Sequence, residues 1–230
     1  IREAISKAIN TNQLSDQHMR GIFQKDVQFV NDKNQQQHDY NIKDTEKILK
    51  EEGYQKNHNG IYEKDGKPLS FNLVIQTAEF PNWKDKAKQV QDQLKKAGIE
   101  LKIKTLDSQS YYDTLWTKKD FDLIFYRTYS DALMPYNFMN SVFKNSDGKS
   151  GVLANDKVLS EKLDAYPKKI NRDEQQQAMD DIFKHFNRSY YGVPIAYPNE
   201  TFVTSHKIES FKFSGLTDAP IDYKHLKVKQ

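Results

Sequence analysis

The sequence contains no cysteine and few residues that interrupt regular structure, with 9 Gly and 7 Pro among 230 residues. The absence of cysteine excludes disulfide frameworks, cysteine nucleophiles and thiolate metal sites. No apolar run approaches the roughly 20 residues that a membrane-spanning helix requires. Basic and acidic residues nearly balance, 35 against 32, so the formal charge is only +3. We therefore expect no nucleic-acid partner, because such a partner requires a concentrated basic face.

Catalytic motifs are missing as well. The sequence has no G-x-S-x-G and no glycine-rich phosphate loop. Asp180 and Asp181 are adjacent on a predicted helix and therefore point in different directions, which excludes a catalytic carboxylate pair. Asp120 and Asp122 share a face, but no further reactive group converges on them in the pattern. We predict that the protein is not an enzyme, with an α/β hydrolytic domain as a remote alternative.

The sequence is rich in aromatic residues, 13 Tyr and 13 Phe, which favours a folded domain over disorder. Apolar spacing predicts helices over 1–10, 44–53, 83–98, 110–116, 159–170 and 174–190. Strands are predicted over 61–63, 69–76, 99–104, 121–126, 193–197 and 201–204, with 61–76 as a hairpin that turns at Asp65-Gly66. The order of strands and helices predicts an α/β fold, a mixed sheet with flanking helices in which 121–126 is central.

Several segments, taken in order, are recognisable together. The run IREAISKAIN opens the chain, DTEKILKEEGY covers 44–54, and RDEQQQAMDDIFKHFNRSYYGVPIAY covers 172–197. This series resembles the C-terminal lobe of the peptide- and nickel-binding family of extracytoplasmic solute-binding proteins that serve ABC importers. The resemblance implies a periplasmic-binding-protein-like lobe at 1–198 and a segment, 199–230, that returns towards a missing N-terminal lobe. The uncapped helix at the first residue agrees with a fragment of a two-lobed protein.

The segment after the strand 121–126 carries the predicted binding site. YRTY at 126–129 and PYN at 135–137 resemble the nickel-importer pattern of Arg-Thr-Trp followed by Pro-Tyr. The resemblance implies that Arg127 anchors a ligand carboxylate and that Tyr129 and Tyr136 form walls, with Tyr126 and Asn137 beside them. A guanidinium matches a carboxylate with two parallel hydrogen bonds, and tyrosine offers flat apolar area with a polar tip.

Two features depart from that pattern, because Tyr129 replaces Trp and the gap before Pro135 is longer. The alternative role of Arg127 is an internal ion pair with Asp122 or Asp131. The six histidines show no ligand spacing, and 143–155 has no histidine where nickel binders of this type use one. Direct coordination of a metal by the protein is therefore left open.

The resemblance implies a ligand rather than an intrinsic cofactor. We expect nickel or a similar transition metal, held as a small-molecule chelate such as a nickel–amino-acid complex. An oligopeptide or dipeptide is the alternative ligand within the same family. The implied partner is an ABC permease in the membrane, and the implied location is extracytoplasmic, in the periplasm or as a cell-surface lipoprotein.

Overall fold

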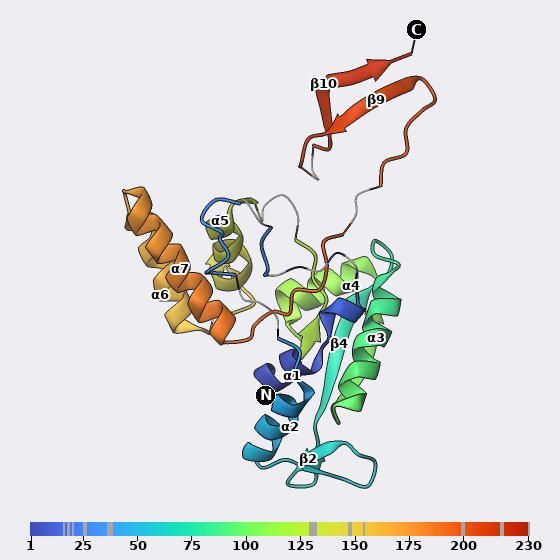
Figure 1. Ribbon diagram of the computed structural model, residues 1–230, viewed down its shortest axis with the longest axis vertical. Helices are drawn as coiled ribbons and strands as arrows, with labels where there is room; N and C mark the ends of the chain where they lie inside the picture. The colour runs from blue at the N-terminus through green and yellow to red at the C-terminus, as the bar shows by residue number, and fades with distance from the viewer. Residues whose placement is uncertain are drawn as a thin grey trace.

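The computed structural model describes residues 1–15, 17, 19, 21–24, 27–35, 39–128, 133–146, 149–153, 155–198, 201–216 and 219–229. The α-helices are α1 (Arg2–Ala8), α2 (Ile42–Glu51), α3 (Trp83–Lys96), α4 (Ser108–Asp113), α5 (Pro135–Met139), α6 (Lys157–Ala165) and α7 (Arg172–Arg188). Shorter helical segments are η1 (Thr11–Gln13), η2 (Thr114–Lys118), η4 (Asn140–Lys144) and η5 (Tyr166–Lys168). The strands are β1 (Gln55–Lys56), β2 (Tyr62–Lys64), β3 (Lys67–Pro68), β4 (Ser70–Gln76), β5 (Glu100–Leu106), β6 (Leu123–Ile124), β7 (Asn145–Ser146), β8 (Lys149–Ser150), β9 (Ile208–Phe213) and β10 (Ile221–Val228). Figure 1 shows how these elements are arranged.

A parallel sheet with the strand order β5-β4-β6 forms the centre of the first half of the molecule. Leu73 of β4 stands opposite Ile103 of β5 on one side and Leu123 of β6 on the other. Parallel neighbours need a long crossover connection, and α3 supplies the one between β4 and β5. β4 lies between the other two strands, and its last four residues, from Leu73 to Gln76, are all buried.

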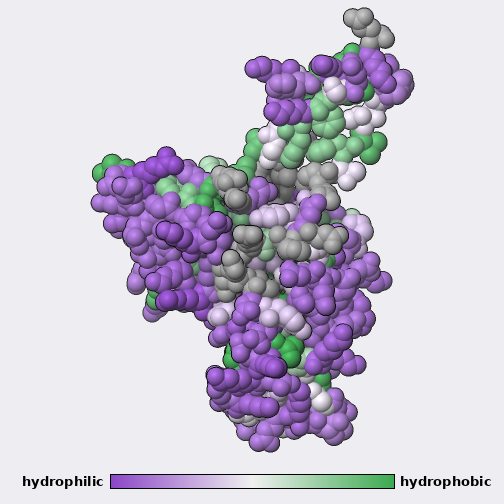
Figure 2. Space-filling model, viewed as in Figure 1, coloured by the Kyte–Doolittle hydropathy of each residue, from purple (hydrophilic) through white to green (hydrophobic). Residues whose placement is uncertain are grey.

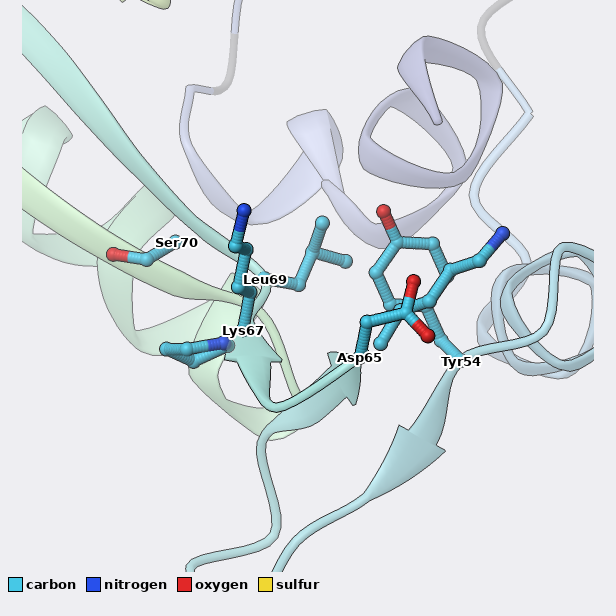
Figure 3. Close-up of a pocket in the computed structure, with 7 residues that line it drawn as sticks. Tyr54, Asp65, Lys67, Leu69 and Ser70 are labelled. Carbon is cyan, nitrogen blue, oxygen red and sulfur yellow. The ribbon is translucent and has the colours of Figure 1, made fainter.

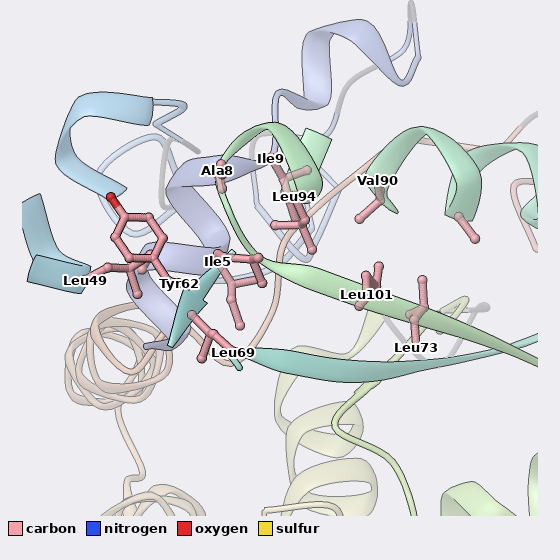
Figure 4. Close-up of a cluster of buried hydrophobic side chains, with 14 of the residues drawn as sticks. Ile5, Ala8, Ile9, Leu49, Tyr62, Leu69, Leu73, Val90, Leu94 and Leu101 are labelled. Atoms are coloured by element: carbon pink, nitrogen blue, oxygen red, sulfur yellow. The ribbon is translucent and has the colours of Figure 1, made fainter. Parts of the chain in front are cut away.

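Helices cover both faces of this sheet. Side chains alternate along a strand, so Leu73 and Ile75 face one side of β4 and Val74 faces the other. Leu73 and Ile75 belong to a core that includes buried residues of α1, α2, α3 and β5. Val74 instead packs with Tyr111 and Leu115, which come from α4 and η2. Figure 4 shows the first of these cores, with Leu94 of α3 and Leu101 of β5 on the same side as Ile5 of α1.

A second core lies among α5, η4, α6 and α7 and includes Phe23 from the N-terminal part of the chain. Its other buried members are Phe138, Met139, Val142, Leu159, Leu163, Met179, Ile182, Phe183 and Phe186. The extended segment after α7 links the two cores, because Tyr191 packs against the second while Val193 and Ile195 pack against the first. Figure 1 shows α6 and α7 side by side, apart from the central sheet.

The C-terminal strands β9 and β10 form an antiparallel hairpin that projects from the rest of the molecule (Figure 1). Every residue of both strands is exposed or half-buried. Phe202 contacts Phe211 and Phe213 with ring centroids 5.5 and 5.4 Å apart. Figure 2 shows hydrophilic side chains over most of this face and apolar colouring at the base of the hairpin.

The predicted α/β class with flanking helices is confirmed. Parallel and antiparallel pairings are both present, but they are in separate sheets, since the central sheet is parallel throughout its described strands. Helix α3 begins at Trp83, and Gly98, at φ +82°, follows its end. The turn at Asp65-Gly66 is confirmed too, with φ values of +53° and +72°. No helix among the described residues is both long and apolar enough to cross a membrane.

Three predicted strands are corrected by the structure. Segment 121–126 contributes only β6, at the edge of the sheet, because the more deeply buried β4 occupies its centre. Segments 193–197 and 201–204 have no strand partner among the described residues. The predicted hairpin ends at β3, and the chain then leaves it at Leu69 to pair in parallel as β4. The pairing of 208–213 with 221–228 was not predicted.

Candidate functional site

A small aromatic pocket lies where the three parallel strands of the central sheet end. It has a volume of about 180 Å³ and is lined by Phe80, Trp83, Tyr111, Tyr112, Trp116, Tyr126 and Arg127. Phe80 and Trp83 follow β4, the next three residues follow β5, and the last two follow β6. Open α/β sheets bind ligands outside the carboxyl ends of their strands, and this pocket collects side chains from all three such ends.

Contacts between rings fix the walls of the pocket. Phe80 stacks on Trp83 with centroids 4.3 Å apart and planes 22° apart. The edge of Trp83 meets Tyr111 at 6.0 Å and Phe125 at 5.8 Å. The Tyr111 hydroxyl donates a hydrogen bond to the backbone carbonyl of Phe125. These contacts join α3, α4 and the segment after β6, so the walls of the pocket are held by contacts within the protein.

Arg127 is half-buried and brings the positive charge to this pocket. Its guanidinium carbon lies 5.7 Å from the centroid of the Phe80 ring, within the range of a cation–π contact. Tyr126 is 37% exposed, and its ring meets the Trp116 ring edge-on at 6.2 Å. The structure therefore brings together two of the residues that the sequence nominated, Arg127 and Tyr126.

A polar rim borders the pocket and was not predicted from the sequence. Gln76, the fully buried last residue of β4, accepts a hydrogen bond through Oε1 from the backbone N–H of Glu79 at 2.9 Å. The Tyr112 hydroxyl donates to Glu79 Oε2 at 3.0 Å. The position of Gln76 and Glu79 just after an apolar strand was the available signal, since such residues reach the carboxyl edge of a parallel sheet.

The other nominated residues do not line this pocket. Tyr136 belongs to the second core and stacks on Tyr166, with centroids 4.6 Å apart and planes 19° apart. Burial raises the pKa of Tyr136 above its ordinary value. Asn137 is exposed, and its amide lies 3.6 Å from Met134 Sδ. Tyr129 lies outside the described residues.

Of the two acids predicted as alternative partners of Arg127, only Asp122 belongs to the described residues. The carboxylate of Asp122 accepts hydrogen bonds from Asn72, at 2.8 Å from the backbone N–H and 3.2 Å from the side-chain amide. Asp131 lies outside the described residues. The Asp122 carboxylate is thus engaged with the neighbouring strand β4.

Histidines and acids do not gather into a metal site within the described part of the chain, where no three such residues could hold an ion together. His185 Nε2 lies 2.7 Å from Asp156 Oδ2, and His225 Nδ1 lies 2.7 Å from Asp222 Oδ2. Neither pair lines the aromatic pocket, since the first joins the start of α6 to α7 and the second lies on the projecting hairpin.

A second hollow, of about 270 Å³, lies at the opposite end of β4. Figure 3 shows its lining residues, which come from the segment after α2, the β2–β3 turn and the start of β4. Lys64 on its wall donates a hydrogen bond to the backbone carbonyl of Glu52 at 2.8 Å. This hollow lies at the amino end of the strand and contains none of the nominated residues, so we do not assign it as the site.

Known proteins share this fold along most of the chain. The structure superimposes on NikA from Brucella suis in complex with Fe(III)-EDTA with a TM-score of 0.81 and 20% identity, covering 99% of this chain and 47% of that one. For the oligopeptide-binding protein AppA from Bacillus subtilis in complex with a nonapeptide, the TM-score is 0.79 at 20% identity, covering 100% and 47%. For NikA from Staphylococcus aureus in complex with Ni(L-His)2, the TM-score is 0.72 at 20% identity, and the match covers 100% of this chain and 48% of that one. The chain thus spans about half the length of the solved structures it matches.

A family profile matches the sequence itself. Residues 1–150 match the profile described as bacterial extracellular solute-binding proteins, family 5 Middle. The matched range includes the central sheet and every residue that lines the aromatic pocket. Members of this family bind solutes and are not enzymes, in agreement with the sequence prediction. The chain belongs to the family 5 bacterial extracellular solute-binding proteins.

Proposed function

We propose that this chain is the ligand-binding lobe of the substrate-binding component of an ABC importer, and that it captures nickel or a similar transition metal as a small-molecule chelate. The observation that carries the proposal is the half-buried Arg127 in an aromatic pocket at the carboxyl ends of three parallel strands. Arg127 is the proposed anchor for a carboxylate of the chelating molecule, and Tyr126 is part of the wall.

The size and chemistry of the pocket suit the binding of one end of a ligand rather than of the whole ligand. Small-molecule sites usually measure about 300–1,000 Å³, so the pocket of about 180 Å³ accommodates one end of a ligand. A guanidinium in a low-dielectric aromatic setting binds a carboxylate more strongly than one in water. The remaining contacts would come from a second lobe that closes over the ligand about a hinge.

The wider proposal follows from the family. Residues 1–198 are the proposed ligand-binding lobe, and 199–230 is the proposed segment that reaches towards the other lobe. Greater affinity of the ligand for the closed form would drive closure, and a membrane permease would then receive the ligand. The proposed location is extracytoplasmic, in the periplasm or as a cell-surface lipoprotein, and the word extracellular in the description of the family supports it.

Peptides are the second candidate ligand. The similarity to AppA, solved with a nonapeptide, is as extensive as the similarity to the NikA proteins. A peptide binder needs polar groups along an extended cleft to meet successive backbone amides, whereas a chelate needs one compact charged pocket. The seven lining residues, six of them aromatic, favour the compact ligand.

The first test is calorimetric titration of the full-length protein with nickel plus L-histidine and, separately, with dipeptides and oligopeptides. We expect heat of binding with the nickel–histidine chelate. In Arg127→Lys we expect at least a roughly tenfold weaker affinity, equivalent to about 1.4 kcal/mol, because an ammonium cannot form the two parallel hydrogen bonds.

Arg172→Lys is the matched control, since Arg172 is an exposed arginine at the start of α7. It should leave the affinity unchanged. Heat with peptides alone would reject the chelate proposal. Equal affinities in Arg127→Lys and the wild type would reject Arg127 as the anchor.

A further inference from the structure

We propose that Glu79 is a specificity-determining residue of the aromatic pocket, whose carboxylate receives the N–H groups of an amino-acid-type ligand while Arg127 receives its carboxylate. The inference rests on the proposed function of this pocket and adds a second charge requirement to it. The ligand would need both an anionic group and an amine or imidazole that still carries hydrogen.

The backbone and the side chain of Glu79 are both held in place. Its backbone N–H donates to Oε1 of the buried Gln76 at 2.9 Å, which fixes the turn after β4. Its Oε2 accepts from the hydroxyl of Tyr112 at 3.0 Å, and the Tyr112 ring is itself part of the pocket wall. Groups held before a ligand arrives lose less entropy on binding, so a carboxylate fixed in this way is suited to recognition.

The Glu79 carboxylate retains capacity for a further donor. A carboxylate can accept about four hydrogen bonds, and within the described part of the chain the Tyr112 hydroxyl is the one donor to this group. Glu79 is exposed, so a ligand entering the pocket can reach it from solvent. The Tyr112 contact positions the carboxylate and leaves Oε1 available.

Residues that line the pocket connect it to charges of both signs: Arg127 lines it directly, and Glu79 reaches it through the hydroxyl of Tyr112. Arg127 lies over Phe80, and Glu79 is the residue that directly precedes Phe80. A ligand with carboxylates alone meets attraction from Arg127 and repulsion from Glu79. A ligand that also presents N–H donors is attracted by both, so the pair discriminates by a penalty as well as by a gain.

Two nickel chelates separate these cases. In a nickel–histidine complex the bound amine and imidazole keep N–H groups, whereas the nitrogens of metal-bound EDTA carry none and its carboxylates remain. Two peptide probes make a related comparison without metal: a dipeptide with a free, charged amino terminus and the same dipeptide acetylated there, which loses the positive charge and two of the three N–H hydrogens at that end.

The experiment measures the affinity of the full-length protein for all four probes by calorimetry, in the wild type, Glu79→Gln and Glu79→Lys. We expect Glu79→Gln to weaken the nickel–histidine complex or the dipeptide with a free amino terminus, whichever the wild type binds, by at least tenfold. Its EDTA or acetylated counterpart should bind as tightly as before or more tightly, because the repulsion from Glu79 is removed. Glu79→Lys should weaken the first of these probes further and tighten its counterpart. Glu161→Gln, the same charge change at an exposed position of α6, should alter neither.

The outcomes distinguish the two proposals. If the chelates bind and Glu79→Gln weakens both equally or neither, the role of Glu79 is overturned and the proposed function stands. If only the peptides bind, the chelate proposal fails, and the free and acetylated peptides decide the role of Glu79. Absence of binding by all four probes would overturn both.

Discussion

At the scale of single residues, Asp156 concentrates more interactions than any other carboxylate described in the second core region. Its Oδ1 accepts from the backbone N–H of Leu159 at 2.9 Å and so caps α6. Its Oδ2 accepts from the Tyr191 hydroxyl at 2.6 Å and lies 2.7 Å from His185 Nε2. Burial favours the neutral acid, but these hydrogen bonds and the nearby His185 outweigh it and lower the pKa of Asp156 below its ordinary value.

Replacement of this carboxylate should destabilise the protein in a pH-dependent way. Asparagine caps helices about as well as aspartate, so Asp156→Asn removes mainly the charge that faces Tyr191 and His185. We expect a loss of about 1–2 kcal/mol in the free energy of unfolding at pH 7, measured by urea titration.

The pH dependence follows from the sign of the shift. A carboxyl group with a lowered pKa in the folded state stabilises the fold above its unfolded pKa of about 3.9, and this contribution disappears as the pH falls through the folded pKa. The difference between wild type and Asp156→Asn should therefore shrink below about pH 4. A difference that stays constant from pH 7 to pH 3 would show that the charge plays no part. Asp32→Asn, at an exposed aspartate, serves as the control.

At the scale of elements, Gly98 joins the end of α3 to the start of β5 where space is lacking. Its φ is +82°, a left-handed conformation that favours glycine. A Cβ at this position would lie 2.8 Å from the Tyr62 ring and 2.9 Å from the carbonyl oxygen of Gly60. Gly66, in the β2–β3 turn, has a similar φ of +72° but no atom within 4 Å of a Cβ.

The two glycines therefore separate backbone strain from steric overlap. We expect Gly66→Ala to lower the free energy of unfolding by about 1–2 kcal/mol, the cost of the left-handed conformation alone. Gly98→Ala should lower it by about 2–4 kcal/mol, because overlap with Tyr62 and Gly60 is added. Urea titrations of both variants provide the measurement, and equal losses would contradict the packing argument.

Local signals predicted helices better than they predicted the places of strands. α3 could be found from its apolar face and its terminal glycine, because both act within a few residues. Segments 69–76 and 121–126 are both apolar, and which of them is central depends on partners distant in the sequence. The β9–β10 pairing escaped prediction for a related reason, since its exposed strands lack the strong apolar alternation that marks a half-buried strand.

The candidate site was predicted in part for similar reasons. Arg127 and Tyr126 could be nominated because they form a short motif directly after a strand. Trp83, Tyr111 and Trp116 could not be, because an aromatic residue on a helix usually belongs to a core. Only the parallel arrangement of β4, β5 and β6 brings their helices to the same edge as Arg127.

At the scale of the whole molecule, the β9–β10 hairpin contrasts with the rest (Figures 1 and 2). Its ladder is irregular, with register shifts between Asp222 and Val228. The hydrogen bonds of the hairpin found within the described residues stay inside the segment from Ser205 to Lys229, as in Lys229 N–H to the Lys207 carbonyl at 2.8 Å. An isolated two-stranded hairpin is only marginally stable in water.

The two cores should therefore hold their fold without this hairpin. We expect deletion of residues 206–230 to change the free energy of unfolding of the remaining chain by less than about 1 kcal/mol, because few contacts cross to the rest. Tryptophan fluorescence during urea unfolding is a suitable measurement, since both tryptophans of the sequence, Trp83 and Trp116, line the aromatic pocket.

Leu73→Ala sets the scale for that measurement, because Leu73 is 2% exposed in the core beneath the sheet. It should cost about 2–5 kcal/mol, as large-to-small replacements in cores do. A deletion that lowers the free energy of unfolding as much as Leu73→Ala does would contradict this prediction. It would mean that the hairpin unfolds cooperatively with the two cores despite its projecting position. A deletion without effect would assign the stability of the pocket to the two cores, and would show that Phe213, which contacts Phe202 at the base of the hairpin, is not needed for that stability.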